Sequence, residues 1–244
     1  LETYLIDALC AYNPSFYRVK ISAQVESSKI ISENAVGTGI SCGVDSLHAV
    51  CCQTGTKFQN HNITHLMFNN VGSHGEGDVA RELYLKRIDS PLKFAKEYNY
   101  KFVATDSNIM DVIKQDHFKT HTYSSIFAVY CMQKLFSVYF YASAGYKYHE
   151  FTLIDKKQIC PGSYEMFSLP IFSTNSIRIY SEGENISRME KIKTLVNYAP
   201  SYKYLNVCLR ADDNCGICEK CIRTLLAIDA AGAIEKYYLV FNIE

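Results

Sequence analysis

The feature that most constrains the fold is an alternation of short apolar segments with helical segments along most of the chain. Buried-strand patterns span residues 34–41, 63–71, 101–108, 137–145 and 204–209. Helical patterns span residues 44–53, 79–99, 123–136 and 220–231, with Ser90-Pro91 interrupting the second of them. Strands that alternate with helices predict a mainly parallel sheet with crossover helices. We therefore expect a doubly wound, Rossmann-like α/β fold with ligands at the carboxyl ends of its strands.

Composition limits the functional classes. The 244 residues are 48% hydrophobic and 20% charged, which is typical of a globular protein. No apolar run approaches the roughly 18 residues of a membrane span, and ten cysteines without a secretory signal indicate reduced thiols, so we expect a cytoplasmic protein. Lys+Arg and Asp+Glu balance at 25 each, whereas nucleic-acid binders usually carry a basic excess, so a nucleic acid partner is not favoured.

The chain divides into three predicted parts. Residues 1–33 resemble a short helix followed by an extended, hairpin-like segment, and the start at Leu1 suggests the end of a larger region. Residues 34–180 form the predicted nucleotide-binding α/β domain, and residues 181–244 a helical and four-cysteine element. Ser187 and Glu190 have capping-box spacing at the start of a helix, and Gly232 stands where a helix C-cap is expected.

The strongest motif follows the first predicted strand and opens the next helix. It is the run Ser41-Cys42-Gly43-Val44-Asp45-Ser46. Small residues let a backbone approach phosphate, and the N–H groups and dipole of a helix N-terminus attract anions. The two serine hydroxyls add donors, and Asp45 can order the loop or hold a magnesium ion. The alternative is a serine-capped helix start in which Gly43 serves a tight turn.

Four cysteines near the end of the chain form the second motif. Cys208, Cys215, Cys218 and Cys221 comprise two overlapping C-x-x-C steps and one upstream thiol. Tetrahedral Zn²⁺ bound by four thiolates at about 2.3 Å fits this spacing, and such a closed shell is structural. An iron–sulfur cluster is the main alternative.

The loop resembles the Ser-Gly-Gly-x-Asp-Ser signature of the PP-loop ATP pyrophosphatases, with Cys42 replacing a glycine. The cysteine pattern, followed by Arg223, is similar to that of 7-cyano-7-deazaguanine synthases, and Arg188 with Glu190 is similar to their basic–acidic helix start. The resemblance implies the adenine nucleotide alpha hydrolase type of fold. It also implies ATP and Mg²⁺ as cofactors, in addition to Zn²⁺.

The resemblance also implies site residues. The loop after the second strand lies near adenosine and substrate in that superfamily, which suggests Phe68, Asn69 and Asn70 as nucleotide contacts. His74 is a candidate for proton transfer, or else a histidine of a surface turn. Asp106 and Ser107 end the third strand and either bind the nucleotide or cap a helix. The implied catalytic set is Asp45, Ser46, Arg188 and His74.

The implied reaction is adenylation of a substrate carboxylate or carbonyl oxygen with release of pyrophosphate, followed by attack of a nitrogen nucleophile. The substrate would be a small or modified-base-like molecule with an amine or ammonia donor, bound to a homodimer or a larger complex. The segment FNNVGSHG lacks the aromatic-Gly-Gln run of the deazaguanine enzymes, which suggests a different substrate.

Two alternatives stay open. One is sulfur transfer of the PP-loop type to tRNA or a small molecule, for which Cys160 is the candidate metal-free thiol. The other is a sensor or scaffold that binds ATP without turnover. His117 and His121 lie four residues apart without a third ligand of matching spacing, so we expect them in a polar pocket or on a helix surface.

Overall fold

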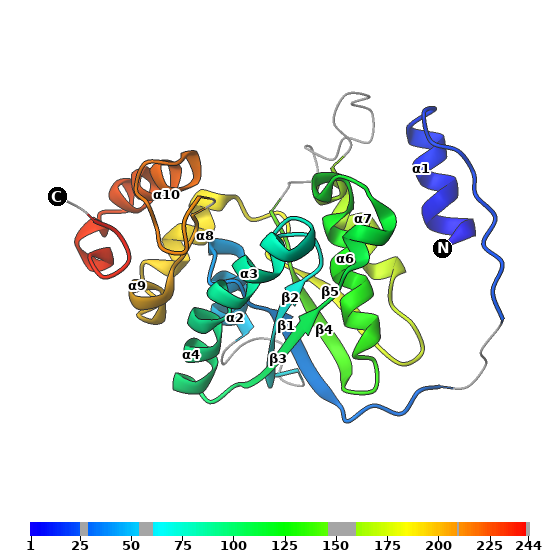
Figure 1. Cartoon of the computed structure of the whole chain (residues 1–244), viewed down its shortest axis with the longest axis horizontal. Coiled ribbons are helices and arrows are strands. Elements are labelled where there is room, and N and C mark those ends of the chain that lie inside the picture. The colour runs from blue at the N-terminus through cyan, green and yellow to red at the C-terminus, as the bar shows by residue number, and fades with distance from the viewer. Residues whose placement is uncertain (25–28, 54–60, 146–159, 209, 243–244) are drawn as a thin grey trace.

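The computed structural model describes residues 1–24, 29–53, 61–145, 160–208 and 210–242. Five strands form one sheet in the order β3-β2-β1-β4-β5, and every neighbouring pair is parallel. The strands are β1 (Ala35–Gly39), β2 (His65–Asn70), β3 (Lys101–Asp106), β4 (Phe136–Ala142) and β5 (Arg178–Glu182). Helices flank this sheet (Figure 1), which confirms the predicted doubly wound α/β fold.

The helices follow the strands as crossover connections. In chain order they are η1 (Glu2–Ile6), α1 (Asp7–Tyr12), α2 (Val44–Gln53), α3 (Gly77–Arg87), α4 (Asp89–Glu97), α5 (Ile109–Ile113), α6 (His117–Cys131), η3 (Pro161–Tyr164), α7 (Glu165–Ile171), α8 (Arg188–Leu195), α9 (Pro200–Tyr204), α10 (Glu219–Ala230) and η4 (Ile234–Tyr237). None of these described helices is both long and apolar enough to cross a membrane.

Each face of the sheet has its own apolar core, because successive strand residues point to opposite faces. In β2, Leu66 belongs to one core and Met67 to the other. The first core is completed by side chains of α2, α4 and α8, including Leu47, Phe94 and Leu195. The second is completed by η1, α6 and α7, including Leu5, Val129 and Leu169. Both faces are therefore buried, as expected of a parallel sheet.

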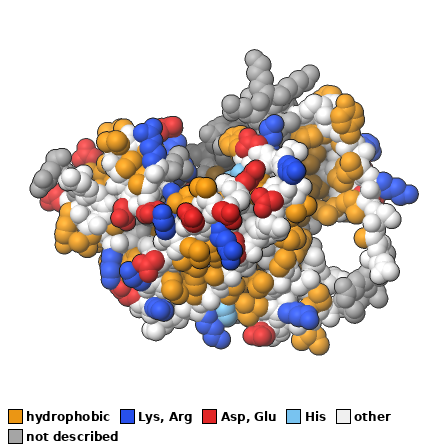
Figure 2. Space-filling model, in the orientation of Figure 1, with side chains coloured by type: hydrophobic (Ala, Val, Ile, Leu, Met, Phe, Trp, Pro, Cys, Tyr) orange, Lys and Arg blue, Asp and Glu red, His pale blue; other side chains and the backbone are white. Residues whose placement is uncertain are grey.

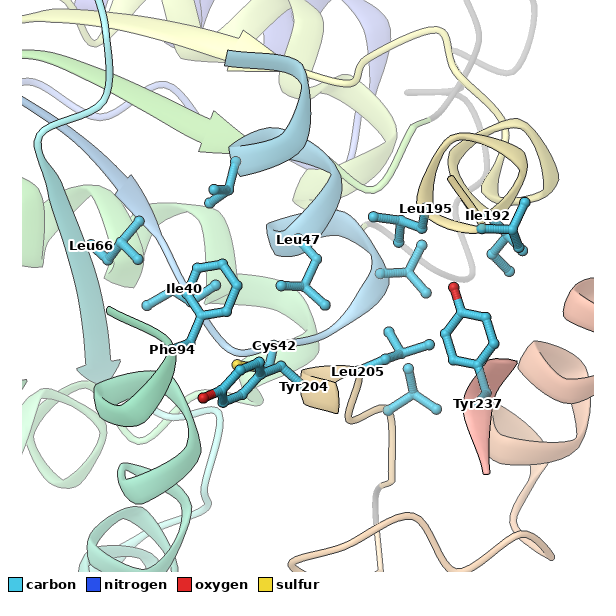
Figure 3. Close-up of a cluster of buried hydrophobic side chains, with 14 of the residues drawn as sticks. Ile40, Cys42, Leu47, Leu66, Phe94, Ile192, Leu195, Tyr204, Leu205 and Tyr237 are labelled. Atoms are coloured by element: carbon cyan, nitrogen blue, oxygen red, sulfur yellow. The ribbon is translucent and has the colours of Figure 1, made fainter. Parts of the chain in front are cut away.

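The C-terminal helices extend the first core beyond the sheet. Tyr204 and Leu205 meet Leu47 and Phe94 in one buried cluster, and Tyr237 lies at its far side (Figure 3). Helices α8, α9 and α10 lie together at one end of the molecule (Figure 1). The segment that follows α9 contacts the loop after β1, since the Asn206 N–H donates to the Cys42 carbonyl oxygen at 2.9 Å.

Three sequence predictions of secondary structure were wrong. Residues 204–208 contain no strand, because Tyr204 ends α9 and the apolar residues after it fill the core as irregular chain. The fifth strand is β5, in the segment for which only short extended pieces were predicted. A short apolar run can form either a strand or a buried irregular segment. Here the packing in the core favours the irregular segment. In the described part of residues 13–34 there is also no hairpin, although the predicted helix before it is present.

Candidate functional site

The loop between β1 and α2 is held by its own serine hydroxyls. The Ser41 N–H donates to Ser46 Oγ at 3.2 Å, and Ser46 Oγ donates to the Gly43 carbonyl oxygen at 3.1 Å. The Gly43 N–H reaches Ser41 Oγ at 3.3 Å. These bonds fix the loop at the first turn of α2, where the helix dipole and backbone N–H groups favour an anion.

Cys42 has a backbone of the left-handed type, with φ 58°. Such a conformation favours glycine, which explains why the related signature has glycine there. The Cys42 side chain is fully buried and turns into the core beside Tyr204 (Figure 3). Burial raises the pKa of this thiol to about 12. The substitution therefore leaves the ligand side of the loop clear, and only the backbone of Cys42 remains in the loop.

Asp45 stands between two cations of α8. Its Oδ1 lies 2.7 Å from Lys191 Nζ, and its Oδ2 lies 3.6 Å from Arg188 Nη1. Lys191 is fully buried and also donates to the Ser143 carbonyl oxygen after β4. The lysine thus ties the loop, α8 and the end of β4 together.

Sequence reasoning missed Lys191. One signal was available, because Lys191 follows Arg188 by three residues and precedes Leu195 by four, which places all three on one helical face. A lysine on an apolar face needs a partner, since an unpaired buried charge is costly. The partner, Asp45, is 146 residues away in sequence and could not be identified from spacing.

Arg188 is positioned by the predicted capping box. Ser187 Oγ accepts from the Glu190 N–H at 3.3 Å, and the Ser187 N–H donates to Glu190 Oε2 at 2.8 Å. The guanidinium contacts Thr224 Oγ1 of α10 at 3.4 Å through Nη2. Within the described residues its Nε–H is buried without a hydrogen-bond partner. A buried donor of this kind is costly unless a ligand or water accepts from it.

One cavity of about 590 Å³ collects most of the predicted site. Residues of the loop, of the end of β2, of α8 and of the cysteine segment line it together. Among the predicted residues, the lining includes Ser41, Gly43, Val44, Asp45, Ser46, Phe68, Asn69, His74, Arg188 and Cys208. Lys86, Arg87 and Lys220 add positive charge to the same walls. The cavity lies at the carboxyl ends of β1, β2 and β4, where parallel sheets bind ligands.

His74 lies in an aromatic corner of this cavity. Its ring is 5.5 Å from Phe68 and 5.6 Å from Tyr84, both edge to face, while Phe68 and Tyr84 stack at 5.3 Å. Burial, followed by the nearby Arg87, lowers the pKa of His74 to about 4. The imidazole is therefore neutral at pH 7 and is suited to accept a hydrogen bond or a proton from a ligand.

The structure places Asn70, Asp106 and Ser107 in a neighbouring hollow. Asn70 Nδ2 donates to Asp106 Oδ1 at 2.7 Å, and Arg81 Nε pairs with Asp106 Oδ2 at 3.1 Å. Ser107 Oγ accepts from the Ile109 N–H at 3.2 Å, at the start of α5. These residues line a separate cavity with the start of α3. Their polar groups bond to one another, and their assignment to the nucleotide stays a prediction.

The four cysteines converge as a set of metal ligands. The sulfur atoms of Cys208, Cys215, Cys218 and Cys221 all lie within 4.8 Å of one another. The N–H groups of Arg210 and Ala211 donate to Cys208 Sγ at 3.3 Å each, as they would to a thiolate. Such a donor set fits a metal ion. Because Cys208 also lines the main cavity, the cysteine element forms part of its wall.

No family model and no curated protein matches this sequence. At the level of structure, the comparison with solved structures shows a shared fold. It is similar to the U34-tRNA thiolase NcsA from Methanococcus maripaludis, a protein described with its 4Fe-4S cluster. The TM-score is 0.50 over 86% of this chain and 70% of that one, at 13% sequence identity. At that identity the similarity shows the shared fold alone.

Proposed function

We propose that this protein is an ATP pyrophosphatase of the PP-loop type that adenylates a carboxylate or carbonyl oxygen of its substrate. The observation that carries the proposal is the Ser41–Ser46 loop with Arg188 and Lys191 gathered on Asp45 beside it. The substrate oxygen attacks the α-phosphorus of ATP, and pyrophosphate leaves. Fixed donors and cations that face the departing phosphates stabilise that step most in the transition state.

The state of Arg188 supports a bound triphosphate, within walls that also carry Asp89, Asp212 and Asp213. Asp45 already neutralises the buried Lys191, whereas Arg188 is held more loosely at 3.6 Å and has a free buried N–H in the described structure. Arg188 is therefore available to phosphate. A magnesium ion that arrives with ATP would find the Asp45 Oδ2 atom as its carboxylate ligand. Magnesium neutralises charge on the leaving pyrophosphate.

The nucleophile that follows adenylation has two candidates. Attack by ammonia or an amine gives an amide, as the 7-cyano-7-deazaguanine synthase-like sequence pattern implies. Sulfur transfer is the second candidate, and the fold shared with a tRNA thiolase supports it at least as well. Zero net charge and the mixture of acidic and basic side chains on the face shown in Figure 2 favour a small substrate over a large RNA.

We propose zinc for the four-cysteine element. Four sulfurs about 2.3 Å from a single tetrahedral ion lie about 3.8 Å apart. In a 4Fe-4S cluster each cysteine binds a different iron, which spreads the sulfurs further. Mutual distances within 4.8 Å therefore support a single ion. The ion would hold the cavity wall that carries Cys208 and Lys220 in place. Elemental analysis should give close to one zinc per chain, and iron with a visible absorption band would overturn this assignment.

The adenylation proposal is tested with Arg188→Ala and Ser46→Ala. Pyrophosphate release is measured with ATP and the small-molecule fraction of a cell extract, and ATP binding is measured by calorimetry. We expect Arg188→Ala to cut pyrophosphate release tenfold or more, since a charged bond to a developing anion contributes about 2–4 kcal/mol. Ser46→Ala should weaken ATP binding.

The matched control is Glu235→Ala, an exposed acidic residue in the first turn of η4 that lines neither the main cavity nor the neighbouring one. It should leave both measurements unchanged. Wild-type pyrophosphate release by Arg188→Ala, together with unchanged ATP affinity of Ser46→Ala, would refute the site. ATP binding without any pyrophosphate release by the wild-type protein would instead identify a nucleotide sensor.

A further inference from the structure

A chain of polar side chains extends from the main cavity toward α7. It contains Cys160 at the start of η3, His121 and Thr122 on α6, and Glu165 at the start of α7. Cys160 Sγ lies 3.4 Å from His121 Nε2, and His121 Nδ1 lies 3.2 Å from Thr122 Oγ1. Thr122 Oγ1 donates to Glu165 Oε1 at 3.1 Å. Residues from three separate elements are thus joined in one continuous series of contacts.

The hydrogen-bond donors and acceptors around His121 determine the tautomer of its neutral imidazole. Thr122 Oγ1 donates its single hydroxyl proton to Glu165 Oε1. Thr122 Oγ1 must then accept from His121 Nδ1–H, which leaves the lone pair of Nε2 directed at the Cys160 thiol. A thiol, a base in reach of it and a third group that orients the base constitute the arrangement of an activated nucleophile.

Burial keeps both groups neutral at rest. Burial, and then His117, lowers the pKa of His121 to about 4, so the imidazole carries no proton on Nε2 or Nδ1 beyond its single N–H at pH 7. Burial raises the pKa of the Cys160 thiol, so the resting sulfur keeps its proton and needs a base to become a nucleophile.

The same series of polar side chains is connected to the loop Ser41–Ser46. Ser143 Oγ donates to Glu165 Oε2 at 2.8 Å, while the Ser143 carbonyl oxygen accepts from Lys191, the partner of Asp45. His121 itself lines the main cavity together with Ser41 and Ser46. The base therefore lines the space in which an adenylated substrate would form, and the buried Cys160 thiol lies behind it, 3.4 Å from His121 Nε2.

We infer that Cys160 is a catalytic nucleophile that attacks the adenylated carbon, with His121 as its base and with Thr122 and Glu165 as positioning residues. The inference rests on the proposed adenylation. The Cys160 proton passes to His121 Nε2 while the sulfur forms a bond to the substrate carbon. The carbon–oxygen bond to AMP breaks, and AMP leaves with its electron pair. The substrate is then held on Cys160 as a thioester or, from a carbonyl oxygen of an amide, as a thioimidate.

The second half of the reaction releases the enzyme. Ammonia or an amine forms the new carbon–nitrogen bond, the carbon–sulfur bond breaks, and His121 returns its proton to the sulfur. The surplus proton of the nitrogen goes to solvent. The covalent step separates the departure of AMP from the arrival of the nitrogen donor, so that the two need not occupy the cavity together.

The first test measures the thiol directly, with iodoacetamide as the probe. Peptide mass spectrometry follows alkylation of Cys160, and the exposed Cys131 of the same helix as His121 serves as the internal reference. We expect His121→Gln to slow alkylation of Cys160 at least tenfold, and Thr122→Val to slow it several-fold. Cys131 should react at the same rate in all proteins. Equal Cys160 rates in wild type and His121→Gln would overturn the inference.

The second test separates this inference from the adenylation proposal. Pyrophosphate and AMP release are measured in a single turnover with ATP and the small-molecule fraction of a cell extract. We expect Cys160→Ser to release pyrophosphate but at least tenfold less AMP than wild type, while Ser46→Ala loses both. AMP release at the wild-type rate by Cys160→Ser would refute the nucleophile alone. No pyrophosphate from wild type would refute adenylation, and the alkylation result would still decide the state of the thiol.

Discussion

The loop Ser41–Ser46 and the four-cysteine element line the same cavity but are held in different ways. The loop is fixed by groups of the chain itself, namely the serine hydroxyls and the Asp45–Lys191 pair. The cysteine element has four sulfur atoms within 4.8 Å of one another, a geometry that the proposed ion would complete. The comparison teaches that one wall of the cavity depends on buried charge and the other on metal supply. Separate perturbations should therefore act first on different walls of the cavity.

Removal of the metal should have the largest effect, confined to one wall. Metal binding contributes roughly 10 kcal/mol or more to the folding of small four-ligand sites. After chelation we expect hydrogen exchange to accelerate across residues 205–221, while the amides of β1 and β4 stay protected. Cys131→Ala, which changes a thiol outside the cluster, is the control and should respond to the chelator as wild type does. Uniform exchange across both regions would show that they are not separate.

Asp45→Ala should be the most damaging single change on the loop side. It leaves Lys191 fully buried without its carboxylate, and breaking a buried pair in this way costs about 3–5 kcal/mol. Urea denaturation measures the loss. The double variant Asp45→Ala/Lys191→Met should recover most of it, because no charge is then stranded. A loss of only about 1 kcal/mol, the value of a helix cap, would show that the pair does not hold the loop.

Glu165 should make stability depend on pH. Burial raises the pKa of Glu165 from 4.5 to about 7, so the folded state binds a proton that the unfolded state has lost between these values. Stability should fall as pH rises through this window, by up to about 1.4 kcal/mol per pH unit. Glu165→Gln should flatten the profile between pH 4.5 and 7. An identical pH profile of the free energy of unfolding in both proteins would contradict the buried carboxyl.

Cys42→Gly should have the smallest effect. Glycine relieves the left-handed backbone, worth about 1–2 kcal/mol, but loses the buried side chain, a loss of similar size. We expect a net change below about 1 kcal/mol in urea denaturation and unchanged ATP affinity. Altered affinity would mean that the Cys42 side chain reaches the ligand after all. Gly43 and the other loop residues are unchanged in this variant, so any change in ATP affinity is assigned to position 42.

Local patterns were sufficient to predict β1 to β4, the loop and the cysteine set, but not β5. Each of these depends on residues close together in sequence, such as Ser41 with Ser46 or Cys215 with Cys218. The partners of Asp45 and His121 lie far along the chain and arise from how helices cross the sheet. Glu165 and Thr122 carried no signal, because a lone carboxylate and a threonine are ordinary surface residues in a sequence. These two residues become buried only in the folded structure.

The bond from the Asn206 N–H to the Cys42 carbonyl oxygen, at 2.9 Å, has a thermodynamic consequence. It joins the backbone of the phosphate loop to the segment that leads into Cys208, so order in one favours order in the other. Linkage of this kind is reciprocal. If a bound ion tightens ATP binding by some factor, bound ATP must tighten binding of the ion by the same factor. The affinity of the cysteine element for its metal, measured with and without ATP, would then show whether ATP has bound at the loop on the opposite wall of the cavity.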